Sequence, residues 1–342
     1  MEENNYYNDV NMSFNNEKEA IAVKKDMRNA GLFFLLLIIL EFPVGIGIGV
    51  VQMFFPKDSE ILVSVLITQG YLLVVAWIFM LITGKSYTRD FNLKKYKLSS
   101  FFLSLLVMLC AAPMAICLNV LSQLFVKNQT SAAIFEITNK VPWWLGIIII
   151  GCLPGFVEET IYRGIMFSAF RKYSILAGVV ISAVSFGLMH LNFNQMPYAI
   201  YLGLIFAFMV EATGSITSTM VMHMIFNAFN TAYLYILPAL YGKLKELGAT
   251  QTDMSIEELV NKTPEPSEIF ALLKGLFPLA VIGVVLVILI IAKIAEINGR
   301  SFSRESICGV NESAKGQKPV GIFIILGWIV CLIMSVVNLL FS

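Results

Sequence analysis

Two acids and one base lie close together inside an apolar stretch of this sequence: Glu158, Glu159 and Arg163. Residues four apart lie on one face of a helix, so Glu159 and Arg163 can form an ion pair. Glu158 points about 100° away from Glu159 and cannot share that pair equally. We therefore expect the Glu159 carboxylate to be tied to the guanidinium, while the Glu158 carboxylate stays free to take a proton from water.

The two histidines of the chain lie in other apolar runs. His190 closes the run SFGLMH one turn after Phe186, and His223 opens HMIFN one turn before Asn227. Imidazoles and an amide are groups that orient water and stabilise a developing oxyanion, so these residue types predict the addition of water to a peptide carbonyl. One Glu with two His also approaches a zinc-ligand set, which makes Glu158, His190 and His223 candidate ligands of a divalent metal.

Each of these residues also has an ordinary structural interpretation. A single transmembrane His or Asn most often bonds a neighbouring helix, and an isolated Glu–Arg pair in a membrane is most often structural. The functional interpretation depends on their combination, because both histidines lie one turn from a polar or aromatic residue, on runs close to the paired glutamates.

The elements that must position these side chains are membrane-spanning helices. The chain of 342 residues is 58% hydrophobic and 14% charged, whereas about a quarter of the residues in a soluble domain are charged. Runs of about 20 apolar residues cross a bilayer. Such runs lie near 30–55, 60–84, 99–126, 143–169, 174–192, 197–213, 215–240, 269–294 and 319–341. They predict an all-α transmembrane bundle of nine spans, or of eight because the sixth run is short.

We expect this bundle to be divided into five segments. These are a disordered cytoplasmic tail over 1–28, N-terminal helices over 29–140, a helical core that carries the chemistry over 141–240, an outer loop over 241–268 and C-terminal helices over 269–342. Two further acids lie in the spans. Glu41 precedes Pro43 and lines either a substrate path or a kink, and Glu211 is expected to reach the interface from a span end.

Basic residues predict the orientation of the bundle. Lys and Arg gather in alternate connecting segments, namely 18–28, 85–97, 171–172 and 293–318, so the positive-inside rule places the N-terminus in the cytoplasm. His190 then lies about 24 Å from the inner edge of its span, and His223 about 12 Å. Either the run 174–192 begins deeper, or the fifth and sixth spans are broken or partly re-entrant.

At these residues the sequence resembles the CPBP family of intramembrane proteases, also called the Abi or type II CAAX prenyl endopeptidase family. The family motifs EExxxR, FxxxH and HxxxN/D read here EETIYR (158–163), FGLMH (186–190) and HMIFN (223–227). The resemblance covers roughly residues 140–232. It implies a CAAX protease-like membrane hydrolase, an intramembrane endopeptidase that cleaves a membrane-proximal peptide or protein.

The resemblance also implies a role for each motif residue. Glu158 and His190 would activate the attacking water, and His223 and Asn227 would stabilise the oxyanion. Glu159, Arg163 and Phe186 would support the site. Family members have been described both as metalloproteases and as metal-free glutamate-dependent proteases. We favour no required cofactor, with a divalent metal such as zinc as the alternative.

The expected surroundings follow from the same features. We expect a multi-pass protein of a bacterial plasma membrane whose partners are the lipid bilayer and a peptide or membrane-protein substrate. The formal net charge of +1 argues against nucleic acid as a partner. One alternative is a bacteriocin-immunity or accessory membrane protein that uses the same polar core for binding. A proton-coupled transporter is a further class, which the lack of an internal repeat disfavours.

Overall fold

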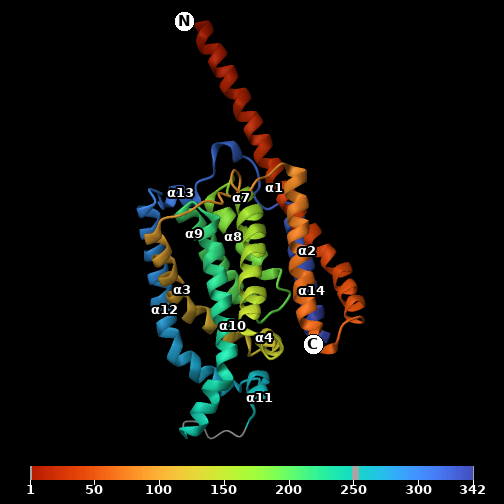
Figure 1. Cartoon of the computed structure of the whole chain (residues 1–342). Helices are drawn as coiled ribbons and strands as arrows, with labels where there is room; N and C mark the ends of the chain where they lie inside the picture. The colour runs from red at the N-terminus through yellow and green to blue at the C-terminus, as the bar shows by residue number, and fades with distance from the viewer. Residues whose placement is uncertain (1, 249–253, 342) are drawn as a thin grey trace.

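The chain folds into a bundle of helices, described by a computed structural model over residues 2–248 and 254–341 (Figure 1). No strand occurs among these residues, and eight of their helices are long and apolar enough to cross a membrane. They are α1 (Glu2–Gln52), α2 (Glu60–Thr83), α3 (Leu98–Ser122), the helix Trp143–Phe170, α9 (Met196–Thr213), α10 (Ile216–Glu246), α12 (Pro266–Ile297) and α14 (Ile322–Phe341). The prediction of an all-α polytopic bundle is therefore confirmed.

Shorter helices connect or accompany these spans. They are η1 (Lys57–Ser59), α4 (Gln129–Thr138), α8 (Ile175–Leu188), α11 (Ile256–Asn261), α13 (Arg304–Cys308) and η4 (Glu312–Ala314). The connection between α10 and α12 is shorter than the expected loop over 241–268, because α10 continues to Glu246 and α12 already begins at Pro266. Residues 249–253 of that loop lie outside the described residues.

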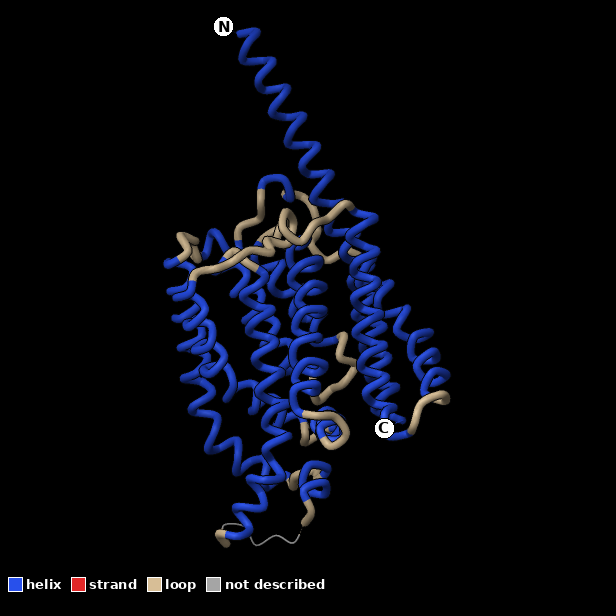
Figure 2. The backbone as a smooth tube through the Cα atoms, in the orientation of Figure 1, coloured by secondary structure: helices blue, strands red, loops and turns tan. Residues whose placement is uncertain are grey.

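The short member of the bundle is α8, and not the sixth apolar run. The helix α8 has 14 residues and is about 21 Å long, less than the roughly 30 Å hydrocarbon core of a bilayer. It packs against α9, and the loop between them lies part-way along the bundle (Figures 1 and 2). The structure thus favours a partly re-entrant pair, which is one of the two arrangements expected from the sequence, and among the described residues the run 174–192 rather than 197–213 falls short of a full span.

The two ends of the chain lie at opposite ends of the bundle (Figure 1). Among the described residues this arrangement fits seven helices that cross the bundle from end to end, namely α1, α2, α3, Trp143–Phe170, α10, α12 and α14, with α8 and α9 as a pair that enters and leaves from the same end. The connections that carry the basic segments 85–97, 171–172 and 298–318 all follow helices that run toward the N-terminal end of the bundle. Which side of a membrane that end faces stays a prediction.

The N-terminal segment differs from the disordered tail expected over 1–28. A single helix, α1, begins at Glu2 and extends beyond the other helices (Figure 1). Ala, Glu and Lys are strong helix formers, and they are frequent in the part of this segment that precedes the first span. Val23, Met27 and Ala30 are buried against the bundle, so packing holds the helix well before the apolar run begins.

Candidate active site

The helix Trp143–Phe170, which carries the EExxxR motif, is not a regular α-helix. Its elements are α5 (Trp143–Gly146), the π-helix η2 (Ile147–Cys152), α6 (Leu153–Glu159), the π-helix η3 (Thr160–Phe167) and α7 (Ser168–Phe170). Pro154 at the start of α6 lacks the N–H of a regular helix, which a wider turn before it accommodates. π-Turns often occur at functional sites. Both glutamates lie in α6, the short α-helix between the π-helices η2 and η3.

Two glycines bring this helix against α10. A Cβ built on Gly151 would lie 3.1 Å from the backbone of Ala228, and one on Gly155 would lie 2.8 Å from the backbone nitrogen of Met224. Small residues four apart allow transmembrane helices to approach this closely. Gly155 is therefore a contact point between helices rather than an opening for water, and it places α6 beside the turn of α10 that bears His223.

Glu159 is the centre of a buried polar cluster. Its Oε1 atom lies 2.9 Å from Nη1 of Arg163 and 3.0 Å from Nδ1 of His223. The side chains of Glu159 and Arg163 are both 0% exposed, so the ion pair predicted from their spacing is present and fully enclosed. Since Glu159 accepts from Arg163 as a carboxylate, Nδ1 of His223 must be the donor in their hydrogen bond.

The Arg163 guanidinium has further partners that suit a buried cation. Its Nη2 atom donates to the carbonyl of Gly203 on α9 at 3.2 Å. Its Cζ atom lies 4.6 Å from the ring centre of Phe186 and 5.2 Å from that of Phe206, within the range of cation–π attraction. Arg163 thus joins three helices, and Phe186 of the FxxxH motif supports the cluster by this contact.

Glu158 has a different environment from its neighbour. Its Oε2 atom lies 3.8 Å from Nε2 of His223, and its side chain is 16% exposed. That contact is the one ion pair that Glu158 forms with the described residues. The sequence-based expectation of one tied and one available carboxylate therefore agrees with the geometry.

His190 lies just after the end of α8. Its Nδ1 atom is 2.8 Å from the carbonyl oxygen of Phe186, and because a carbonyl only accepts, Nδ1 carries the proton and Nε2 is left as an acceptor in the neutral ring. Glu158 interacts electrostatically with His190. The Phe186 ring contacts both imidazoles, with centroid distances of 4.9 Å to His190 and 5.7 Å to His223. The structure thus gathers both histidines and Arg163 around Phe186.

Asn227 is the least constrained of the predicted site residues. It lies one turn after His223 on α10 and is partly exposed, and its side chain has no hydrogen bond to any described residue. Both the oxygen and the nitrogen of its side-chain amide are therefore available to a bound molecule. No side-chain contact fixes the distance between Asn227 and the other site residues.

The described residues contain no group of three or more His, Cys, Asp or Glu side chains arranged to hold a metal. Nδ1 of each histidine bonds protein, at the Phe186 carbonyl and at the Glu159 carboxylate, and Nε2 of each ring is left for another partner. Metal-binding histidines are commonly oriented by such bonds as well, so whether the chain takes a metal stays a prediction.

Several residues at the site gave no signal in the sequence. Tyr162 is buried with its ring 5.0 Å from that of Phe186, and Phe206 lies 5.3 Å from the His223 ring. Both belong to long apolar runs in which every aromatic residue resembles ordinary core. Only their tertiary contacts distinguish them, namely that of Tyr162 with Phe186 and those of Phe206 with Arg163 and His223.

Glu211 lies in the last turn of α9, at the end of a span as expected. Its side chain is 7% exposed, and it accepts from Arg171 at 2.5 and 2.8 Å and from Arg300 at 3.0 Å. Two arginines from distant basic connections thus converge on one carboxylate, a pairing that spacing along the chain does not reveal, and the position of Glu211 at a membrane interface stays a prediction. These ion pairs join the connection before α8 and the last turn of α9 to the connection after α12.

For Glu41, lining a substrate path and lining a kink both stay predictions. Its Oε2 atom is buried without a hydrogen-bond partner among the described residues. One turn earlier in α1, the carbonyl of Leu37 accepts from the hydroxyl of Tyr71 on α2.

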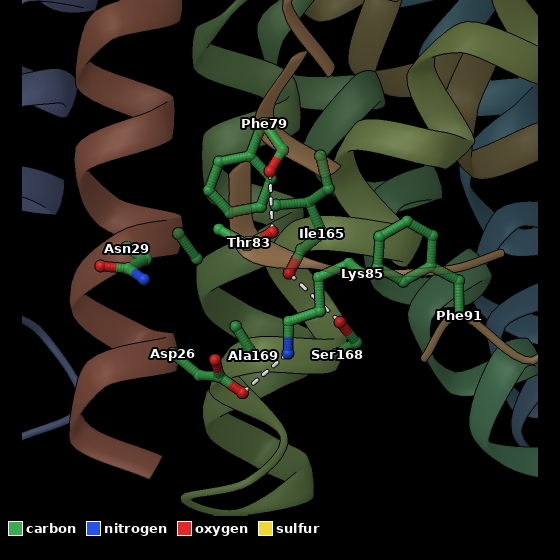
Figure 3. Close-up of a pocket in the computed structure, with 10 residues that line it drawn as sticks. Asp26, Asn29, Phe79, Thr83, Lys85, Phe91, Ile165, Ser168 and Ala169 are labelled. Atoms are coloured by element: carbon green, nitrogen blue, oxygen red, sulfur yellow. Dashed lines mark hydrogen bonds and ion pairs between the residues drawn. The ribbon is translucent and has the colours of Figure 1, made fainter. Parts of the chain in front are cut away.

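Two hollows lie away from this site. One, of about 10 Å³, has room for about one water molecule. In Figure 3 it lies beside Asp26, which faces the ammonium of Lys85 across 2.9 Å, and Lys172 binds the same carboxylate. The other, of about 270 Å³, lies between residues 56–62 and 136–141. Neither is lined by Glu158 or the histidines.

Comparison with known proteins agrees with this site. A family model described as type II CAAX prenyl endopeptidase Rce1-like matches residues 140–229, the segment that holds all three motifs. The CPBP family predicted from the motifs is therefore confirmed for this segment. The segment that carries the motifs is thus similar to a family of membrane proteases, and the eight helices of spanning length among the described residues are those of a multi-pass membrane protein.

A curated relative points the same way. The chain is 29% identical over 104 residues to a protein of Bacillus subtilis (strain 168) that carries the name of a membrane peptidase, YdiL. The match covers 30% of this chain and 42% of the relative. The chain thus matches about two-fifths of the relative's length. No solved structure matches the present chain significantly.

Proposed function

We propose that the chain is an intramembrane endopeptidase that hydrolyses a peptide bond of a membrane-proximal peptide or protein. The observation that carries this proposal is the division of labour between adjacent acids. Glu159 is taken up by Arg163 and His223, whereas Glu158 keeps an available carboxylate beside two histidines. The family match over 140–229 supports the peptidase class.

In this mechanism Glu158 is the general base. It accepts a proton from a water molecule while the water oxygen attacks the carbonyl carbon of the substrate. The unprotonated Nε2 atom of His190 accepts a hydrogen bond from the same water and orients it, because Nδ1 of that ring is occupied by the Phe186 carbonyl. Two acceptors on one water raise its nucleophilicity and fix its direction of attack.

The attack converts the carbonyl oxygen into an oxyanion that needs donors. His223 donates from Nε2 when that ring is doubly protonated, since its Nδ1–H is held by Glu159, and the free amide of Asn227 is the second donor. Glu158 then passes its proton to the departing nitrogen. The C–N bond breaks and leaves a carboxylic acid and an amine, so the atoms of one water are added to the products.

We further propose the surroundings in which this reaction occurs. The chain would lie in a bacterial plasma membrane with its N-terminus in the cytoplasm, because its basic connections gather at the end of the bundle that holds the N-terminus. It would require no cofactor. Chelation by EDTA should then leave cleavage unchanged, whereas loss of activity that zinc restores would favour a metal.

The proposed activity is tested by comparing peptides in membranes of cells that express different variants. Mass spectrometry of peptides from wild-type and Glu158→Gln membranes should show products with new termini that disappear in the variant. Glu296→Gln is the matched control, since Glu296 is an exposed acid paired with Lys293 far from the site, and its membranes should retain the wild-type products. Identical peptides from a folded, membrane-inserted Glu158→Gln protein would refute the proposal.

A further inference from the structure

The loop that follows His190 is fastened at one buried residue, Asn194. Asn194 is 0% exposed, although it belongs to a connection between two helices. Its amide nitrogen donates to the carbonyl of Asn119 at 3.1 Å and to Oγ of Ser122 at 2.7 Å, and its amide oxygen accepts from Asn119 Nδ2 at 3.2 Å. All of these partners lie on the last turn and a half of α3.

The backbone of the same loop is bonded as well. Ser122 donates to the carbonyl of Asn194 at 3.2 Å, and the backbone N–H of Asn194 donates to the side chain of Asn192 at 2.8 Å. The next residue, Gln195, accepts from Thr130 of α4 at 3.2 Å. The loop is therefore fixed to α3 and α4 by polar contacts, in addition to the apolar packing of Leu191 and Met196 against the core.

A strained residue joins this loop to the site. Leu191, directly after His190, has φ of +52°, a left-handed conformation that a branched side chain rarely adopts. Such a residue persists only where its surroundings determine it. On one side lies the end of α8, where His190 bonds back to Phe186, and on the other lies the Asn194 anchor three residues later.

We propose that Asn194 is the positioning residue that sets the depth and direction of His190 in the bundle. The proposal rests on the proposed function for its kinetic part. Without the anchor, the short helix α8 could relax its last turn and Leu191 could leave the left-handed region. The His190 ring would then no longer be held with Nδ1 on the carbonyl of Phe186.

The chemistry of the position requires an amide. Asn194 uses its nitrogen as a double donor and its oxygen as an acceptor. Asn194→Asp places an oxygen against the carbonyl of Asn119, where two acceptors repel. Asn194→Ala removes all three side-chain bonds. Ser122→Ala is the milder variant, since it removes the acceptor of one side-chain bond and the donor to the Asn194 carbonyl but leaves both side-chain bonds to Asn119.

A spectroscopic test is possible because the chain has two histidines. In full-length protein in lipid nanodiscs, labelling with [15N]histidine gives two imidazoles, assigned by His190→Gln and His223→Gln. We expect wild-type His190 to show the Nδ1–H tautomer. Asn194→Ala should shift or broaden that signal and leave His223 unchanged, and Ser122→Ala should do the same to a smaller extent.

Asn298→Ala is the matched control. Asn298 also bonds α3, through Oγ of Ser100 at 2.9 Å, and also bonds a backbone carbonyl, that of Ile294, but it lies at the other end of that helix. Its loss should leave both histidine signals at their wild-type positions. Unchanged His190 signals in folded Asn194→Ala and Ser122→Ala would overturn the positioning role, whether or not the protein is a peptidase.

The kinetic arm uses a peptide identified by the membrane comparison above. Misplacement of a catalytic group by about 1 Å costs about 10²-fold in rate, so kcat of Asn194→Ala should fall by about that factor while KM changes less than about twofold. Asn298→Ala should keep the wild-type kcat. A kcat of Asn194→Ala equal to that of the wild type would overturn the proposal, and so would a loss that Asn298→Ala reproduces.

Discussion

Nδ1 of His223 lies 3.0 Å from Oε1 of Glu159, although the two residues are 64 positions apart in the chain. The same oxygen accepts from Arg163 at 2.9 Å. One buried carboxylate thus neutralises a guanidinium and fixes which nitrogen of a histidine carries its proton. This arrangement leaves the second nitrogen of His223 directed to Glu158, the acid of the pair that remains available.

The first prediction separates the two adjacent acids by stability. Glu159→Gln leaves the Arg163 charge buried without its counter-ion, which should cost about 3 kcal/mol or more of unfolding free energy. Glu158→Gln removes one contact at 3.8 Å and should cost less than about 1 kcal/mol. Thermal unfolding of the detergent-solubilised variants measures the difference, and equal losses would contradict the division of labour.

Asn227 tests the oxyanion role without disturbing the fold. Its side chain bonds no described residue, so Asn227→Ala should leave the unfolding midpoint near that of the wild type. Loss of an oxyanion donor costs about 10²–10³-fold in kcat, and the assay peptide should be cleaved that much more slowly. Asn230→Ala, one turn further along α10 and exposed, is the control. A fully active Asn227→Ala protein would remove this residue from the mechanism.

Gly155 is predicted to be intolerant of any side chain. A Cβ there would lie 2.8 Å from the backbone nitrogen of Met224, and the two helices would have to separate. Overpacking of this kind costs about 1–3 kcal/mol, and it should also move Glu159 away from His223 and slow cleavage. Gly45→Ala, where a Cβ meets nothing within 4 Å, should be neutral in both assays. A neutral Gly155→Ala would show that the contact is not tight.

We expect the ion pairs of Glu211 to hold the connection before α8 against the end of α9. Arg171 binds this carboxylate with two nitrogens at 2.5 and 2.8 Å. A double-mutant cycle with Arg171→Met and Glu211→Gln should give a coupling of about 1–3 kcal/mol in unfolding free energy. Additive effects of the two changes would mean that the pair contributes nothing beyond its separate residues.

Much of the site followed from spacing along the chain. The Glu159–Arg163 pair needs only the pitch of a helix, and three apolar runs with polar residues in their interior must meet in a bundle. The contacts of His190 and His223 with Phe186 could be expected only in outline. Residue types identify which groups are placed together, but distances between helices depend on packing at residues such as Gly155.

Other features depended on tertiary structure that composition does not encode. The helix α8 ends at Leu188, but the apolar run 174–192 continues past that residue, so hydropathy does not reveal the end. The residues after α8 are held in place by the hydrogen bonds of Asn194. The π-turns on either side of α6 are equally invisible in residue types. The polar segment before the first span looked disordered because Val23 and Met27, which are buried, lie among charged residues in the sequence.

The central claim is that Glu158 and His190 act on one water molecule. With purified protein in liposomes and the identified peptide, we expect Glu158→Gln and His190→Gln each to reduce kcat by about 10³-fold or more. Residues that act as a unit are strongly non-additive, so the double variant should be less than about tenfold slower than either single variant. Multiplicative losses, or cleavage by Glu158→Gln at the wild-type rate, would contradict the account.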